Sequence, residues 1–386
     1  MKKFLSVVLA FLMLAVMLPT IALAAEKPVK VGEAEYDTLK AAIDAAEPVN
    51  GVITYEITGK VTVDSTGWVQ VAKAGLTGLT KVEFVGKTDD AEICITGGVA
   101  ILADQTYADQ TYDIDVSFTN LKLSKQNPTY AGDYGHATNY FTCWLRNTNA
   151  AENTVTYTNC TFPNGVCNNQ YGKTIFDNCN FTNNTSSLYN LWNYGGNTEI
   201  KNSTFTGTRG VKLYSEGPSG GTIDINNAKF DGLTEKAAII ASKPVEITIT
   251  KVTVEDCNKG FITRDITGND ELTLNVNGSD ISGTFNVTDA TSAEAAKTEL
   301  KITEGTFTGN TDSVKDYLPE GKTINSNGAV VDKTITIIVP GDTTPADTPK
   351  TEDQKNPSTG ANDMVAAAAA LMAVAALGMS ILSRKK

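Results

Sequence analysis

The chain has 386 residues, of which 41% are hydrophobic and 20% charged, and its formal net charge is −12. This length suits two average domains or one elongated domain. The acidity argues against binding to nucleic acid or anionic lipid through charge, and the presence of a single histidine argues against a zinc site.

The first predicted element is a secretory signal peptide over residues 1–24. Two lysines precede an uncharged apolar run over residues 4–18, and Ala22, Leu23 and Ala24 form a cleavage site with small residues at its ends. This order is typical of secreted proteins, so we expect cleavage between Ala24 and Ala25. A membrane anchor is the alternative, for which the apolar run is short.

A short helix is predicted next, over residues 34–48, near the start of a folded domain that we place at residues 25–339. Either Asp37 or Thr38 can cap its N-terminus. Its apolar residues share one helical face: Leu39, Ala42, Ile43 and Ala46. We expect this helix to cover the first of the repeats that follow, because the open end of a repeat array needs a cap.

One frame of apolar residues then recurs eight times. Apolar or threonine residues stand four and two positions before a turn residue, a mostly small residue follows it, and an apolar residue stands three positions after it. The turn residues are Asn120, Asn159, Asn178, Asn202, Asn227, Asp256, Gly278 and Glu304. From Cys160 onward the small residues are spaced 19, 24, 25, 29, 22 and 26 apart, a period typical of a solenoid. Only the frame at Asp256 lacks the last apolar residue, because Lys259 stands there.

The spacing inside the frame predicts a bend at each turn residue. The two apolar residues before the turn share one strand face, and so do the two after it. The last residue before the turn and the first after it are three positions apart, which in a straight strand would put them on opposite faces. Both pairs face inward only if the chain bends between them, and Asn, Asp and Gly tolerate the left-handed backbone that a bend needs. At Glu304 we expect Gly305 to take the bend. The pattern predicts an all-β parallel β-helix with a ladder of stacked asparagines; a β-sandwich, the alternative, predicts no common frame.

The frame resembles the right-handed parallel β-helix superfamily, which includes pectate lyases, polygalacturonases and surface adhesins. It covers residues 110–310 well and 50–110 more loosely, and the sequence TLKAAIDAA is similar to the helix at the front of such proteins. Parallel crossovers are nearly always right-handed. The resemblance therefore implies a right-handed, pectin lyase-like solenoid, with residues 329–340 as one or two closing strands.

Six cysteines occur after the predicted cleavage site. Cys160, Cys179 and Cys257 take the small position of the frame, which predicts that they are buried. Neighbouring coils lie about 4.8 Å apart, a spacing that permits a disulfide between Cys160 and Cys179. Free thiols that pack as small buried side chains are the other expectation.

The resemblance also implies where an enzyme of this class would hold its chemistry. Pectate lyases use an arginine or lysine as the base and hold Ca²⁺ on acidic side chains. The sequence TRGVKLY offers Arg209 and Lys212 as candidates for catalysis. The acidic residues expected near such an ion are Asp177, Asp224 and Asp231. The alternative for all of these is solvated loop charge, with no cofactor and no metal; no Asp-Asp unit like that of polygalacturonases lies between His136 and Arg209.

Two stretches rich in aromatic residues are the predicted binding surface. Tyrosine and tryptophan rings among asparagines and glycines suit sugars, which stack on aromatic faces and bond to amides. The predicted binding residues are Tyr130, Tyr134, Tyr140, Trp144, Tyr189, Trp192 and Tyr194. The alternative is that these rings pack inward as part of the core.

The C-terminal residues form a linker and an anchor. Residues 340–355 are rich in Pro, Thr and acidic residues and are expected to be extended. The pentapeptide Asn356, Pro357, Ser358, Thr359, Gly360 follows, then an apolar span over 364–382 and a basic tail. This order resembles the cell-wall sorting signal of Gram-positive surface proteins (residues 356–386), although Asn356 stands where leucine is usual. The resemblance implies that a sortase cuts between Thr359 and Gly360 and joins the threonine to peptidoglycan; an ordinary transmembrane anchor is the alternative.

The predicted function combines these elements. We expect a secreted protein that is covalently attached to the Gram-positive cell wall and acts as an adhesin or glycan-binding module toward an extracellular glycan or host surface. The alternative is an enzyme on the same scaffold, a polysaccharide lyase acting on acidic glycans or a glycoside hydrolase.

Overall fold

The computed structural model describes residues 27–334, except for 64–68, 71–75, 97–100, 103–113, 127–139, 146–153, 185–187, 215–220, 234–238, 243–244, 256, 258–261, 265–271, 278, 282–286, 290–297, 303, 309–310 and 316–317. The predicted signal peptide, linker and sorting signal lie outside the described residues. Within these residues no helix is long and apolar enough to cross a membrane.

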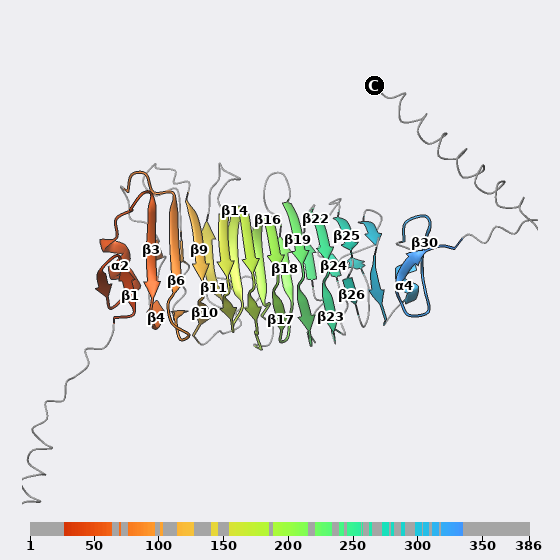
Figure 1. Ribbon diagram of the computed structural model, residues 1–386, viewed down its shortest axis with the longest axis horizontal. Coiled ribbons are helices and arrows are strands. Elements are labelled where there is room, and N and C mark those ends of the chain that lie inside the picture. Colours follow the sequence, from red (N-terminus) through yellow and green to blue (C-terminus); the bar gives the residue numbers. More distant parts are fainter. Residues whose placement is uncertain are drawn as a thin grey trace, which may run out of the picture. The chain divides into compact units, whose positions relative to one another are not determined.

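The described residues are mostly β-strands, which form two long sheets (Figure 1). The first sheet contains β1 (Val29–Val31), β2 (Ala34–Tyr36), β3 (Val52–Ile57), β5 (Val69–Gln70), β6 (Lys81–Gly86), β8 (Ile101–Leu102), β9 (Asp115–Thr119), β11 (Phe141–Leu145), β12 (Thr154–Thr158), β14 (Val166–Asp177), β16 (Leu191–Lys201), β18 (Val211–Tyr214), β19 (Gly221–Asn226), β21 (Ile239–Ser242), β22 (Val245–Thr250), β24 (Ile262–Arg264), β25 (Leu272–Asn277), β27 (Val287–Asp289) and β28 (Thr298–Ile302). The second contains β4 (Lys60–Val63), β7 (Glu92–Ile95), β10 (Lys122–Lys125), β13 (Thr161–Phe162), β15 (Asn180–Phe181), β17 (Thr204–Thr206), β20 (Lys229–Asp231), β23 (Thr253–Glu255), β26 (Ser279–Ile281) and β29 (Gly305–Phe307).

Strands pair in parallel with the equivalent strand of the next coil. Tyr157 of β12 pairs with Phe118 of β9 on one side and with Phe176 of β14 on the other, and the same register continues to Ile200 of β16. Phe162 of β13 pairs in the same way with Phe181 of β15. The prediction of an all-β chain with stacked parallel strands is confirmed.

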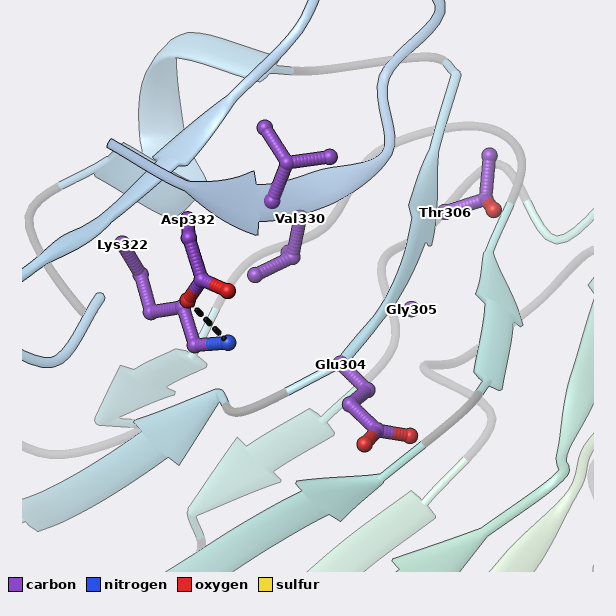
Figure 2. A pocket seen from close by; sticks show the side chains of 7 residues that line it. Glu304, Gly305, Thr306, Lys322, Val330 and Asp332 are labelled. Atoms are coloured by element: carbon purple, nitrogen blue, oxygen red, sulfur yellow. Dashed lines mark ion pairs between the residues drawn. The ribbon is translucent and has the colours of Figure 1, made fainter. Parts of the chain in front are cut away.

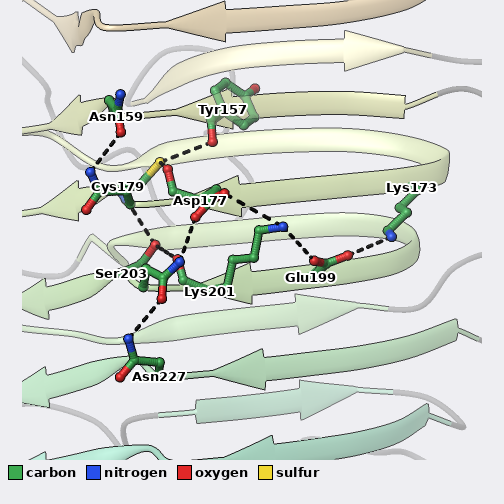
Figure 3. A network of polar contacts seen from close by, with 11 residues as sticks. Tyr157, Asn159, Lys173, Asp177, Cys179, Glu199, Lys201, Ser203 and Asn227 are labelled. Atoms are coloured by element: carbon green, nitrogen blue, oxygen red, sulfur yellow. Dashed lines mark hydrogen bonds and ion pairs between the residues drawn. The ribbon is translucent and has the colours of Figure 1, made fainter.

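The predicted bend is present where the two sheets meet. Asn120, Asn159, Asn178, Asn202 and Asn227 have φ between 53° and 56°, in the left-handed region. The Asn159 side-chain amide donates to Asn120 Oδ1 at 2.9 Å, and the Asn178 amide donates to Asn159 Oδ1 at 2.7 Å. The Asn227 amide donates likewise to Asn202 at 2.8 Å, as Figure 3 shows in part. The Asn202 amide donates to Asp177 Oδ1 at 2.9 Å instead of to Asn178, so the predicted amide ladder is present in two runs with Asp177 between them.

The last predicted bend is also confirmed, because Gly305 has φ 136° beside Glu304. The frame placed around Asp256 is wrong. The left-handed residue of that coil is Lys251, with φ 52°, and Val254 pairs with Phe230 of the previous coil. Val252 and Val254 therefore follow the bend. They resemble a pair that precedes one because both pairs are apolar residues with a single residue between them.

Aromatic rings fill the space between the sheets over much of the chain. Tyr55, Phe84, Phe118, Tyr157 and Phe176 form a column whose successive ring centroids lie 4.8 to 5.1 Å apart. A second column on the other sheet contains Phe162, Phe181, Phe205 and Phe230, with centroids 4.4 to 4.7 Å apart. All nine rings are fully buried, and each contributes about 1.5–3 kcal/mol of transfer free energy.

The N-terminal cap differs from the predicted helix. Residues 34–36 form β2, which pairs antiparallel with β1, so the helix α2 is confined to Leu39–Ala45. Thr38 is the N-cap, and its hydroxyl oxygen accepts a hydrogen bond from the Ala41 amide at 3.1 Å. Leu39, Ala42 and Ile43 are buried as predicted.

The other described end carries α4 (Thr311–Lys315) and a hairpin of β30 (Lys322–Ile324) and β31 (Val330–Asp332). Thr306 of the last coil forms an antiparallel bridge with Ala329. Of the closing segment predicted over residues 329–340, β31 is a strand and residues 335–340 lie outside the described residues.

All six cysteines are buried free thiols, so Cys160 and Cys179 form no disulfide. Both occupy the small position, and the Cys160 thiol donates to the Phe118 carbonyl at 3.4 Å. Cys257 does not occupy this position, because Val252 follows the bend of its coil.

Candidate functional site

Five residues from two separate predictions lie in one place on the outer face of the first sheet. They are the predicted binding residues Tyr140, Tyr189 and Trp192 and the predicted catalytic residues Arg209 and Lys212. Two other predicted binding residues lie on strands: Trp144 is on β11 and Tyr194 is on β16, but their side chains are not described. The remaining two, Tyr130 and Tyr134, lie outside the described residues.

Strand alternation puts these residues on the outside of the coils. Cys167 pairs with Trp192, and Trp192 pairs with Lys212, so the three form one column across β14, β16 and β18. Their neighbours in sequence, such as Val166 and Leu191, point inward and are fully buried. An outward column would be open to water unless another segment covered it.

Leu188 and Tyr189 supply that cover. With Tyr140, Cys167 and Trp192 they form a small apolar group apart from the main core, which we call the Tyr189 cluster. The Tyr189 and Trp192 ring centroids lie 5.7 Å apart at 79°, and those of Tyr140 and Trp192 lie 6.3 Å apart at 85°. Edge-to-face contacts of this kind stabilise aromatic groups beyond their buried area.

The rings of the Tyr189 cluster are buried. Tyr140 is 2% exposed, Trp192 4% and Tyr189 5%, so none offers an open face to a sugar. The Tyr140 hydroxyl oxygen accepts a hydrogen bond from the Tyr189 amide at 2.9 Å, and burial raises the pKa of Tyr140 well above its usual value. The expected exposed aromatic surface is therefore not found at these three positions.

Buried amides hold the segment that carries Tyr189. The Asn183 side-chain amide donates to the Tyr189 carbonyl at 3.2 Å, and the Asn183 backbone amide donates to Asn190 Oδ1 at 2.9 Å. The Asn190 side chain donates in turn to the Thr206 carbonyl at 2.9 Å. Gly207 has φ 118°, and a Cβ there would lie 1.9 Å from the Asn183 carbonyl oxygen. Only glycine allows the backbone at residue 207 to approach Asn183 this closely.

Two cations lie against the rings. The Lys212 ammonium lies 4.8 Å from the Trp192 ring centroid and 5.8 Å from that of Tyr189. The Arg209 guanidinium lies 5.3 Å from the Tyr189 centroid. At these distances the ring quadrupoles attract both cations. Lys212 is buried whereas Arg209 is half-buried, so Arg209 is the member of the pair that reaches solvent.

The acidic residues expected beside a calcium ion lie elsewhere. Asp177 accepts a hydrogen bond from the Asn202 amide at 2.9 Å and lies 3.7 Å from the Lys201 ammonium, in the corner network of Figure 3. Desolvation, with the nearby charge of Glu199, raises the pKa of Asp224.

Asp231 is on the second sheet, 3.1 Å from Lys229. Among the described residues no group of three or more His, Cys, Asp or Glu side chains could hold a metal ion, and His136 lies outside them.

The sequence did not indicate the amides that build this site. Asn183 and Asn190 have no exposed surface, and both lie in a loop whose length fits an ordinary connection.

The chain matches no family model, no curated protein and no solved structure.

Proposed function

We propose that this chain is a secreted surface protein, attached to the Gram-positive cell wall by sortase, whose right-handed parallel β-helix presents a glycan-binding face. The proposal is supported by the predicted signal peptide, by the order of pentapeptide, apolar span and basic tail, and by the stack of parallel strands between them. A rigid stack of coils suits the display of a site away from its point of attachment.

The observation that carries the binding role is the position of Arg209. Its guanidinium lies over the ring of Tyr189, and that ring is fixed by buried amides, so the cation is held in place before any ligand arrives. Pre-organised groups lose little conformational entropy on binding. A guanidinium offers several donors to sugar hydroxyls and forms two parallel bonds with a carboxylate.

Binding explains this geometry better than proton abstraction. A guanidinium is a planar fork of N–H donors with no acceptor, so this side chain is suited to donating hydrogen bonds to a ligand. We therefore assign Arg209 to ligand contact. The alternative is a polysaccharide lyase with Arg209 as the base and Ca²⁺ as the cofactor, and the test below distinguishes the two.

The test is a glycan array probed with the full chain in mild detergent, beside an absorbance assay for unsaturated product on polyuronates. We expect binding without turnover, reduced at least tenfold in Arg209→Gln. Lys229→Gln is the matched control, because it removes one cation on the second sheet and so reports loss of charge alone. Turnover that disappears in Arg209→Gln would show a lyase, and equal loss in both variants would refute a specific site.

A further inference from the structure

A second site lies at the other end of the described coils, where the terminal hairpin meets the last coil. The hairpin is joined to that coil near residue 306, by the Thr306–Ala329 bridge and by a hydrogen bond from the Phe307 amide to the Gly328 carbonyl at 2.8 Å. Away from this junction the two diverge and leave an open pocket of about 550 Å³ (Figure 2). Its volume is in the range of small-molecule and side-chain sites.

The pocket walls carry unequal charge. The hairpin contributes Lys322 and Asp332, whose ammonium and carboxylate lie 2.8 Å apart. The coil contributes Glu304, an exposed carboxylate that makes no ion pair or hydrogen bond with the described part of the chain. The pocket therefore carries a net charge of −1, and because Asp332 is paired with Lys322, the unpaired charge is that of Glu304. A ligand that complements these walls is a cation directed at Glu304.

The rest of the lining selects the shape of that cation. Val330, which is half-buried and packs against the main core, gives the pocket a small apolar wall beside the charged groups, and Thr306 adds a hydroxyl. A compact hydrated ion gains nothing from this wall, whereas an ammonium on an aliphatic stem buries its methylenes there. Figure 2 shows Glu304 and the Lys322–Asp332 pair on opposite sides of this space.

We propose that this pocket binds the side chain of a lysine in a partner peptide, with the ammonium on Glu304 and the stem against Val330. The site is separate from the Arg209 face and does not depend on glycan binding. Glu304 and Asp332 are both exposed, so each contact is screened by water and salt. Binding of a single lysine side chain is therefore weak, and the test needs a method that detects weak binding.

The probe is Nα-acetyl-lysine methylamide, observed by saturation-transfer NMR with the full chain in mild detergent. We expect saturation of the side-chain methylene protons, no signal from the norleucine analogue, and weaker signal as salt is raised. Glu304→Gln should weaken binding about threefold, as expected for one exposed ion pair, whereas Glu320→Gln, an exposed carboxylate outside the pocket, should leave it unchanged.

A gain of binding separates this proposal from simple misfolding. Lys322→Met removes the competing cation and leaves two carboxylates for the ligand, so binding should tighten at least threefold. Equal binding of norleucine, or no effect of Glu304→Gln, would overturn the proposal. Glucosamine binding as tightly as the lysine probe, with the same response to the variants, would overturn it too, because the partner would then be an amino sugar.

Discussion

The asparagine at each corner should raise the free energy of unfolding, and Asn159 is the clearest position to test. It has φ 54°, and it donates one side-chain hydrogen bond to Asn120 and accepts one from Asn178. Alanine in the left-handed region costs about 1–2 kcal/mol. Each exposed hydrogen bond contributes about 0.5–1.5 kcal/mol, so the loss of both bonds and the backbone strain together predict about 2–5 kcal/mol for Asn159→Ala.

Glycine at the same position separates the two causes. Asn159→Gly loses the same hydrogen bonds but has no Cβ, so it should be more stable than Asn159→Ala even after its added chain entropy of about 0.5–1 kcal/mol. Asn180→Ala is the control, because this exposed asparagine lies in a strand and accepts one bond, from Thr204 at 2.9 Å. Urea unfolding followed by circular dichroism measures all three. An alanine variant as stable as the wild type, or more stable than the glycine variant, would refute the argument that the bend requires a left-handed residue.

Three further predictions follow from burial and from the anchor. Phe181→Ala removes a ring packed 4.7 Å from Phe162 and 4.4 Å from Phe205, and should cost about 3–5 kcal/mol in urea unfolding; a cost below 1 kcal/mol would contradict the ring column. Burial raises the pKa of Cys143 from 9.0 to about 12, so its contribution to stability is complete below pH 9 and is lost as the pH rises through 12. The decline of stability above pH 9 should be shallower in Cys143→Ala, and equal slopes would show that the folded thiol titrates normally. Deletion of residues 356–386 should release the protein into the medium of a sortase-positive host, whereas a full chain that detergent extracts from membranes would show a transmembrane anchor.

Much of the fold could be predicted because the spacing of apolar residues in the frame determines where the chain must bend. An odd step between two inward pairs forces a bend, and asparagine marks it at five corners. The register failed at Lys251, where a lysine adopts the left-handed backbone against its intrinsic preference. Its neighbours hold it there, because Val252 is fully buried and a shift of the strand would expose it. Tertiary packing therefore determines where this coil bends, and the residues around Lys251 do not indicate the bend by their type.

The site was harder to predict than the fold. Aromatic residues and cations were singled out, but strand alternation alone says only that Trp192 points outward. Whether an outward ring is exposed depends on a segment that folds over it, here Leu188 and Tyr189, and that segment is held by Asn183. A polar residue with no exposed surface cannot be recognised from its type, because asparagine is also the usual loop residue.

The arrangement in coils also decides how the two proposed sites are to be tested. In a solenoid each coil contacts only its neighbours, so stability is close to a sum of local terms. Arg209 follows β17, whereas Glu304 precedes β29, and the coils of β20, β23 and β26 separate them. A substitution at one site should therefore leave binding at the other unchanged. If Arg209→Gln weakened the lysine probe, or Glu304→Gln weakened the glycan, the coils would have to transmit the change over that distance, and the two sites would no longer be independent.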